Sequence, residues 1–287
     1  MIDLPLVPSG LNNRGQIAGY ALTDGNAGAV LWSHGTVTSL GTLPGNIWSY
    51  GQAINDRGQV VGASENPSPW RAFLWEQGTV TPLGALPGGM HSTATGINCR
   101  NQVAGYSNTD VGIFVHAFLW QNGVMTDLGT LPGGSYSMAQ AINCRGQVVG
   151  VADTAIGNGL VEEHAFLWEH GVMKDLGPGV ATAVNNFGDV VGHSGPPTAM
   201  RAVLWSRGGV VDLGALPNQT SGGATGINDR REIVGFSGLR GFIWRNGVMR
   251  DLGIDPGTGS VYPTAINFFG HVVGTAQGRG FLAVPAR

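Results

Sequence analysis

Charged residues are scarce in this chain, where they make up 11% of 287 residues, against roughly 25% in ordinary globular proteins. Lys174 is the only lysine, and the net charge of −3 comes without any block of basic residues. Nucleic-acid-binding proteins concentrate positive charge, so this composition argues against a nucleic-acid partner. No apolar run approaches the ~18 residues that a membrane-spanning helix needs, which argues against a membrane location.

Cysteine is almost absent as well, and the only two cysteines, Cys99 and Cys144, stand 45 residues apart in similar stretches of sequence. We expect neighbouring repeats to hold them too far apart for a disulfide. Free thiols are typical of a reducing compartment. The first ten residues lack the basic and apolar regions of a signal peptide. Together these absences predict a cytoplasmic protein.

Glycine is abundant, with 49 residues, while the hydrophobic fraction is 42%. The hydrophobic content is too high for a disordered chain. Many turn-forming glycines with few charges favour an all-β protein.

Three phrases recur along the whole chain. The asparagine of "I-N-x-x-G-Q-V-V-G" falls at Asn12, Asn55, Asn98, Asn143, Asn185, Asn228 and Asn267, at spacings of 39 to 45 residues. "A-F-L-W" and its variants follow each of these asparagines, and "G-V-x-x-D-L-G" follows six of them. Ile2–Pro5 resembles the Asp-Leu-Gly phrase, so the N-terminus can supply the strand that the last repeat lacks.

Each repeat contains four short apolar runs separated by turn residues, which we name strands a to d in chain order. Four strands per ~43 residues is the spacing of a β-propeller. We predict a single seven-bladed propeller over residues 1–287, with repeats that start near residues 10, 53, 96, 141, 183, 226 and 265. Residues 1–5 are expected to complete the last blade.

The phrases as a set resemble the HAF repeat, named for His-Ala-Phe, which stands here at His116–Phe118 and His164–Phe166. The resemblance covers essentially the whole chain. It implies a repeat scaffold and no particular activity, since HAF-repeat proteins are mostly described as extracellular and without assigned activity. This chain departs from that description because it shows no secretion signal.

The repeated residues are expected to form the scaffold, with Phe118, Leu119 and Trp120 packed between blades. For His116 and His164, a structural hydrogen bond is the simpler reading than a metal site. Function is expected where the repeat is broken, in the b–c and d–a loops of one face. The longest of these loops, Val151–Glu163, predicts a rim that is raised over blades three and four and low over blades six and seven.

The variable loops and the neighbouring strand a supply the candidate site residues. Counting back from the repeat asparagines and along the loops gives the substrate-binding candidates Trp48, Tyr50, Gln52, Trp70, Phe114, Tyr136, Met138, Gln140 and Tyr262. The candidate acids and bases are Glu162, Glu163, His91 and His193. Two simpler readings stay open: Gln52 and Gln140 belong to a polar ring that can bind channel waters, and exposed loop carboxylates can be merely solvated.

These features predict a propeller that binds an apolar, natural-product-like small molecule at the long-loop face. We expect it to act without a cofactor, as a cyclase or in a dehydration or conjugate addition, by general acid–base catalysis. No nucleotide-binding or metal-binding motif is present in the sequence, so no cofactor or metal is expected. Two alternatives remain, a propeller that scaffolds protein partners and a secreted propeller that binds carbohydrate.

Overall fold

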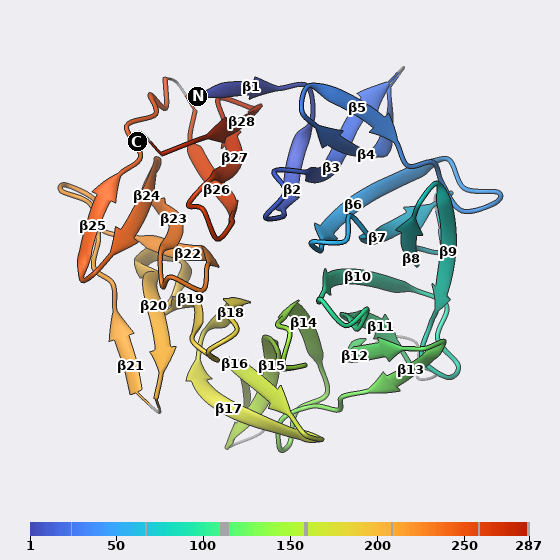
Figure 1. Cartoon of the computed structure of the whole chain (residues 1–287). Coiled ribbons are helices and arrows are strands. Elements are labelled where there is room, and N and C mark those ends of the chain that lie inside the picture. Colours follow the sequence, from blue (N-terminus) through green and yellow to red (C-terminus); the bar gives the residue numbers. More distant parts are fainter. Residues whose placement is uncertain are drawn as a thin grey trace.

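The computed structural model describes residues 1–23, 25–66, 68–109, 115–157, 160–207, 209–257 and 259–285. Within these ranges, 28 strands form seven antiparallel sheets of four strands each, arranged as blades around a central channel (Figure 1). The predicted seven-bladed propeller is therefore confirmed. The helical content of the described residues is one short 3-10 helix, Pro197–Ala199. No described helix has the length and hydrophobicity needed to cross a membrane.

Blades one to four follow the predicted order, with strand a nearest the channel. Blade one contains β2 (Val7–Leu11), β3 (Ile17–Thr23), β4 (Asn26–Ser33) and β5 (Thr36–Ser39). Blade two contains β6 (Trp48–Ile54), β7 (Val60–Glu65), β8 (Arg71–Glu76) and β9 (Thr79–Gly84). Blade three contains β10 (Ser92–Ile97), β11 (Val103–Asn108), β12 (Val115–Gln121) and β13 (Val124–Asp127). Blade four contains β14 (Ser137–Ile142), β15 (Val148–Gly157), β16 (Leu160–Glu169) and β17 (Val172–Pro178).

The remaining blades close the ring. Blade five contains β18 (Val180–Val184), β19 (Val190–Ser194), β20 (Arg201–Ser206) and β21 (Gly209–Asp212). Blade six contains β22 (Gly222–Ile227), β23 (Ile233–Ser237), β24 (Arg240–Arg245) and β25 (Val248–Asp251). Blade seven contains β26 (Val261–Ile266), β27 (Val272–Ala276) and β28 (Arg279–Ala283), and its fourth strand is the N-terminal β1 (Ile2–Leu4). Ile2 lies opposite Leu282, as the sequence predicted for the closing strand.

The hydrophobic core lies between blades rather than inside any one of them. One cluster combines Val61 and Ala72 of blade two with Ala94 and Phe118 of blade three. The phenylalanine of the "A-F-L-W" phrase is fully buried in blades two, three, four, six and seven. Leu119 and Trp120 pack against such clusters while partly buried. Burial of these repeated side chains at every contact between blades explains why the phrase recurs.

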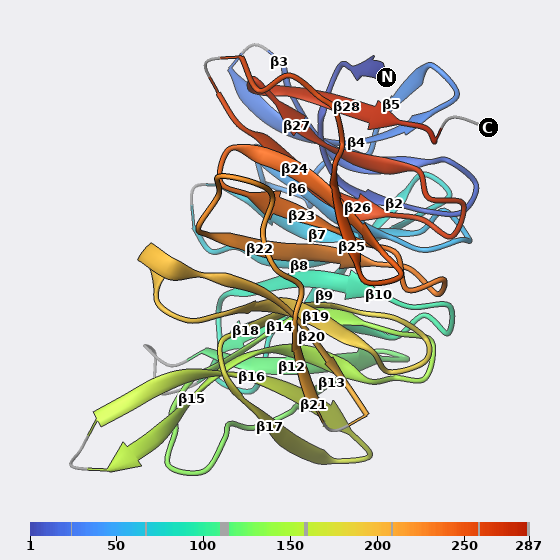
Figure 2. The ribbon, with the colours of Figure 1, turned by 90° about the vertical axis from the view of Figure 1, so that its left-hand side faces the viewer.

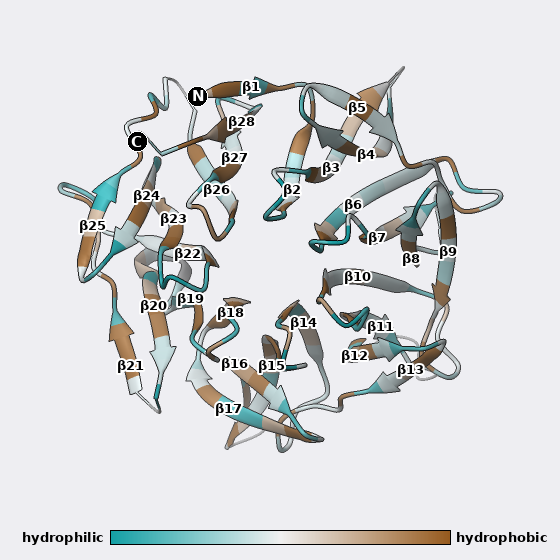
Figure 3. Cartoon of the chain, in the orientation of Figure 1, coloured by the Kyte–Doolittle hydropathy of each residue, from teal (hydrophilic) through white to brown (hydrophobic). Residues whose placement is uncertain are grey.

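The repeated asparagines form a closed ring of hydrogen bonds around the channel. Each side-chain Nδ2 donates to the backbone carbonyl of the asparagine in the next blade, from Asn12 to Asn55 (3.0 Å) and onward until Asn267 donates to Asn12 (3.1 Å). Each Oδ1 accepts backbone N–H groups from its own a–b turn, as at Asn98. These hydrophilic turns surround the channel in Figure 3.

The histidines of the HAF phrase have a structural role. His116 Nδ1 lies 2.8 Å from Asp127 of the adjacent outer strand, and His164 Nδ1 lies 2.9 Å from Asp175. In blade five, Arg201 replaces the histidine and contacts Asp212 at 3.3 Å. The structural reading of His116 and His164 is thus confirmed, and it explains why the HAF and Asp-Leu-Gly phrases recur together.

The expectation for the cysteines is wrong. Cys99 and Cys144 form a disulfide between the a–b turns of blades three and four, with their Cα atoms 5.4 Å apart. The a–b turns of these neighbouring repeats lie side by side, and a Cα separation of 5.4 Å is within the range of disulfides. A disulfide is typical of an oxidising compartment. The predicted cytoplasmic location therefore loses the support that free thiols lent it.

The long-loop face is uneven, as predicted for blades four, six and seven. The paired strands β15 and β16 are ten residues long and extend beyond the other blades at the left of Figure 2. In blades six and seven, two-residue turns connect strand b to strand c. The corresponding loop of blade three, residues 110–114, lies outside the described residues, and so does the candidate Phe114.

Candidate functional site

A pocket of about 500 Å³ lies on the long-loop face, where blade two meets blade three. Its walls are formed by Gln52, Trp70, His91, Ser92, Thr93, Tyr106, Asn108 and Val115. Three of the predicted site residues, Gln52, Trp70 and His91, are therefore brought together. Among the residues that the structure describes, the lining contains no carboxylate, lysine or arginine. Such a surface suits an uncharged, mostly apolar ligand.

His91 is held in the pocket wall by hydrogen bonds on both sides. The side-chain Oδ1 of Asn108 accepts the backbone N–H groups of Met90 (2.8 Å) and His91 (2.7 Å). The His91 Nδ1 accepts the backbone N–H of Trp70 at 3.3 Å. Because Nδ1 is an acceptor here, the neutral ring carries its hydrogen on Nε2. His91 can therefore donate a hydrogen bond to a ligand.

A row of stacked aromatic rings connects the pocket to blade one. Tyr50 and Trp70 are stacked, with ring centroids 5.7 Å apart, and Tyr20 meets the edge of Tyr50 at 5.2 Å. Burial, followed by the nearby charge of Glu65, raises the pKa of Tyr50. The carboxyl pKa of Glu65 is itself raised by burial. This row presents a flat apolar wall beside the pocket.

A second group of predicted residues lies on blades four and five. Burial, followed by the charges of Glu163, Tyr106 and Asp153, raises the pKa of Tyr136 to about 12. Burial lowers the pKa of His193, and the charge of Glu163 opposes that change. Glu163 therefore lies within electrostatic reach of both rings. His193 Nδ1 is buried and has no hydrogen-bond partner among the described residues.

Tyr106 joins the two groups, because it lines the pocket and its charge also acts on Tyr136. Asp153 fixes Tyr136 by accepting the backbone N–H groups of Ser135 and Tyr136, each at 2.7 Å. The Tyr136 hydroxyl lies 2.8 Å from the sulfur of Met138. A candidate acid–base pair, Glu163 and His193, thus lies on the same mouth of the channel as the apolar pocket.

The other predicted residues lie apart from the pocket. The Trp48 indole donates to Asn26 of blade one at 3.0 Å, so it links two blades. Glu162 is exposed, and its carboxylate lies 3.6 Å from His164 Nε2. Tyr262 stacks on Phe236 at 5.1 Å, on the far side of the mouth. Gln140 is half-buried on β14.

Three aromatic residues of the mouth were missed by sequence reasoning: Tyr20, Tyr106 and Phe236. All three directly follow the glycine that ends the "Q-V-V-G" phrase. The residue after this glycine pairs with the residue five positions before the repeat asparagine. In blade three, for example, Tyr106 pairs with Thr93. An alignment of the residue after this glycine in all repeats would have revealed an aromatic position.

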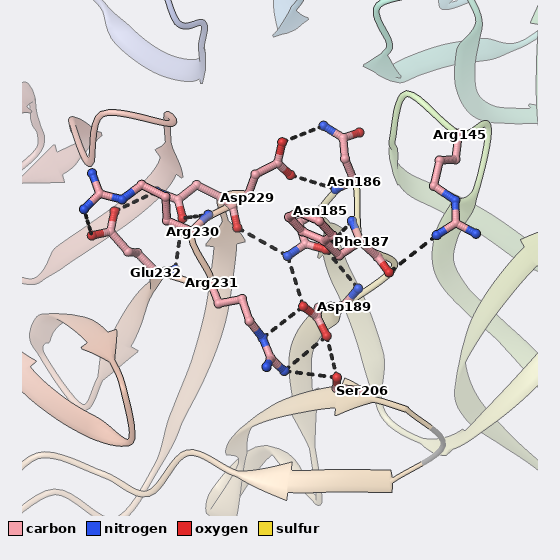
Figure 4. Close-up of polar contacts among 11 residues, drawn as sticks. Arg145, Asn185, Asn186, Phe187, Asp189, Ser206, Asp229, Arg230, Arg231 and Glu232 are labelled. Carbon is pink, nitrogen blue, oxygen red and sulfur yellow. Dashed lines mark hydrogen bonds and ion pairs between the residues drawn. The ribbon is translucent and has the colours of Figure 1, made fainter.

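On the opposite face, the a–b turns of blades five and six carry a network of charges (Figure 4). Carboxylates replace the glutamine of the repeat phrase at Asp189 and Glu232, and both are buried. Arg231 reaches across to Asp189 at 3.0 Å, and Arg245 contacts Glu232 at 2.9 Å. Asp189 also bonds to Ser206. This network joins blades five and six and holds its charges paired, so we assign it to the scaffold.

No group of three or more histidine, cysteine, aspartate or glutamate side chains in the described ranges could hold a metal ion.

Comparison with known proteins identifies a fold rather than a family. No family model matches the sequence, and no curated protein matches it. Among solved structures, the chain is similar to the β-propeller domain of the Trilobed protease from Pyrococcus furiosus, with a TM-score of 0.61 at 10% identity over 98% of this chain and 93% of that one. That domain is described as having an open velcro topology, whereas β1 closes the ring here.

Two enzymes show the same overall fold. A streptogramin B lyase structure matches with a TM-score of 0.55 at 10% identity, over 99% of this chain and 95% of that one. A gluconolactonase from Xanthomonas campestris matches with a TM-score of 0.50 at 11% identity, over 99% of both chains. At these identities the likeness concerns the fold alone.

Proposed function

We propose that this propeller binds an uncharged, mostly apolar small molecule at the long-loop mouth and converts it without a cofactor. The observation that carries the proposal is the pocket of about 500 Å³ between blades two and three, whose described lining residues include a titratable histidine and no carboxylate, lysine or arginine. The stacked rings of Tyr50 and Trp70 extend it as a flat wall. A site that is apolar with a few fixed polar groups is typical of small-molecule binding.

Glu163 and His193 are the proposed acid–base pair. A histidine with a lowered pKa is neutral at pH 7 and can accept a proton, while the charge of Glu163, which acts on His193, can stabilise the imidazolium that results. Cyclisation, conjugate addition and loss of water need only a proton removed at one atom and returned at another. These reaction types fit because they consume no external oxidant or reductant.

The fold neighbours are compatible with this proposal. A lyase and a gluconolactonase with the same architecture indicate that a propeller can carry an active site. We also propose that the chain is a HAF-repeat protein, an assignment that implies no particular activity.

The test uses purified protein incubated with a small-molecule extract of the source cells, followed by mass spectrometry. We expect one compound to be retained and converted to an isomer, or to a product lighter by one water. Trp70→Ala should abolish retention, whereas Phe187→Ala, which truncates an exposed side chain on the opposite face, should leave it unchanged. Retention without conversion would indicate a binding protein, and retention that survives Trp70→Ala would refute the assigned site.

A second candidate function, the scaffolding of a protein partner, is favoured by one observation on the opposite face. The second residue after each repeat asparagine is exposed and is arginine or phenylalanine: Arg14, Arg57, Arg100, Arg145, Phe187, Arg230 and Phe269. The fold thus gathers into one ring arginines that are widely separated in the sequence. Such a ring suits an acidic partner with apolar side chains.

This second candidate has its own test. A triple variant, Arg14→Ala, Arg57→Ala and Arg100→Ala, should lose any protein that co-purifies with the wild type at low salt. If the same proteins remain bound to the triple variant, the scaffolding function on this face is refuted. Retention of the small molecule should be unaffected by the triple variant.

A further inference from the structure

A hydroxyl group bonds neighbouring blades next to the channel at five of the seven contacts between blades. Strand a of every blade has a β-bulge, and a bulge changes the direction in which the bulged side chain points. In five blades this residue is serine or threonine, and its hydroxyl shares its hydrogen between a carbonyl of its own strand b and a carbonyl of the next blade. The contacts to the next blade are Ser9 to Gly51 (2.5 Å), Thr95 to Ala139 (3.0 Å), Thr182 to Ala224 (2.8 Å), Thr225 to Pro263 (2.8 Å) and Thr264 to Pro8 (3.3 Å). We call this bond the hydroxyl clasp.

Blades two and four lack the clasp because their bulged residues are Gln52 and Gln140. Neither side chain makes a hydrogen bond to another of the described residues. Gln52 is exposed and lines the pocket between blades two and three. The pocket thus lies at the contact between blades two and three, where Gln52 takes the place of the residue that forms the hydroxyl clasp.

The groups that face this pocket constrain what it can bind. The Gln52 amide offers a donor and an acceptor side by side. His91 offers a donor at Nε2, because its Nδ1 already accepts the Trp70 N–H. None of the described lining residues is a carboxylate, lysine or arginine that could neutralise an ionised ligand, and burying an unpaired charge is costly. Trp70, stacked on Tyr50, favours a flat ligand body.

We propose that Gln52 is a specificity-determining residue. Its side chain makes no interblade bond and instead pairs with an uncharged planar ligand that has adjacent hydrogen-bond donor and acceptor groups. A lactam or a carboxamide on an aromatic body is the simplest example of this class. The inference rests on the proposed small-molecule function, and it names the class of compound that the site selects.

Three neutral probes test it. Nile red reports an apolar site, 2-quinolone carries an adjacent N–H and C=O, and N-methyl-2-quinolone keeps the body but lacks the donor. We expect the wild type to bind 2-quinolone about tenfold more tightly than the N-methyl compound, as for one good hydrogen bond. Calorimetry or competition against Nile red fluorescence measures the ratio.

The variants separate the clasp from the ligand contact. Gln52→Thr can restore the hydroxyl clasp, so we expect a higher melting temperature together with a ratio near one. Gln52→Ala should also give a ratio near one, without the gain in melting temperature. Ser9→Thr, which keeps a hydroxyl at the equivalent position of blade one, should preserve the wild-type ratio.

The outcomes distinguish this inference from the function on which it rests. If Nile red binds and depends on Trp70, but the quinolones do not bind or their ratio is unchanged in Gln52→Thr, the role of Gln52 is overturned and small-molecule binding stands. If Nile red does not bind, or binds independently of Trp70, the proposed function fails and this inference fails with it.

Discussion

Tyr50 of β6 and Trp70 of the loop before β8 lie in stacked contact within blade two, with ring planes 26° apart. Trp70 remains 37% exposed, so Tyr50 is what holds the indole against the pocket rather than in solvent. The contact therefore couples the inner strand of the blade to the variable loop that carries the pocket wall.

Replacing Tyr50 tests that coupling. Tyr50→Leu should weaken Nile red binding several-fold, because the indole loses the ring that orders it. The free energy of unfolding should fall by only about 1 kcal/mol, the range of an aromatic pair beyond its burial. Fluorescence titration and urea denaturation measure the two effects, with Tyr50→Phe as the control that keeps the stack. Full affinity in Tyr50→Leu would show that Trp70 needs no support.

The carboxylate of Glu163 should control the titration of His193. Because a negative charge favours the imidazolium, Glu163→Gln is expected to lower the pKa of His193 further below its ordinary value of 6.5. Resonances of the histidine ring, followed by NMR against pH, measure this change. Glu162→Gln is the matched control, since Glu162 contacts His164 instead. An upward shift in Glu163→Gln would contradict the proposed pairing.

The same group makes stability depend on pH in a defined direction. The folded protein holds His193 with a lowered pKa, so the unfolded chain takes up the proton more readily. His193 therefore contributes no pH dependence above its unfolded value, and it destabilises the fold as the pH falls below about 6.5. His193→Asn should flatten this part of the stability profile.

The asparagine ring should be among the most sensitive parts of the scaffold. Asn98 is buried, and its side chain takes part in four hydrogen bonds, including one to Asn143 of the next blade. Asn98→Ala leaves several buried groups without partners, so we expect a loss of about 2–4 kcal/mol. Asn66→Ala, which removes a single exposed bond, should cost below about 0.5 kcal/mol. Equal losses in the two variants, measured by denaturation, would count against the ring.

The disulfide occupies a position that hydrogen bonds fill elsewhere. The residue after the ring asparagine pairs across blades as Asn13 with Asp56, as Cys99 with Cys144, and as Asn186 with Asp229. Replacing both cysteines by serine, or reducing the wild type, should cost about 2–4 kcal/mol. Cys99→Asn with Cys144→Asp should recover part of that loss, because it copies the other two pairs. No response of the melting temperature to reductant would show that the bridge contributes nothing.

The scaffold could be predicted from the sequence because each repeated residue has one structural role that recurs from blade to blade. The asparagine, the Phe118 position and the His116–Asp127 pair recur with the blade, so counting them reveals the blade number. The pocket was only partly foreseen. Trp70 and His91 were identified in the variable loops and Gln52 in the polar ring of strand a, but the sequence alone did not show that blades two and three bring them together.

Contacts between blades account for what was missed. Tyr20 touches Tyr50 from the preceding blade, and no spacing within one repeat reveals that contact. The disulfide was rejected for the same reason, since the separation of two equivalent turns depends on how tightly the blades crowd the channel. The ring of exposed arginines also appears only when seven distant turns are placed side by side.

The pairing of residues after the ring asparagines has a consequence of parity. The three pairs use the residues of six blades. Because the propeller has seven blades, the equivalent residue of one blade has no reciprocal partner. That position is Phe268 of blade seven, whose backbone N–H bonds to Asn13 while its ring remains exposed. Blade seven is also the blade assembled from both ends of the sequence. The blade that joins the two ends of the chain is therefore also the blade whose residue after the ring asparagine has no reciprocal partner.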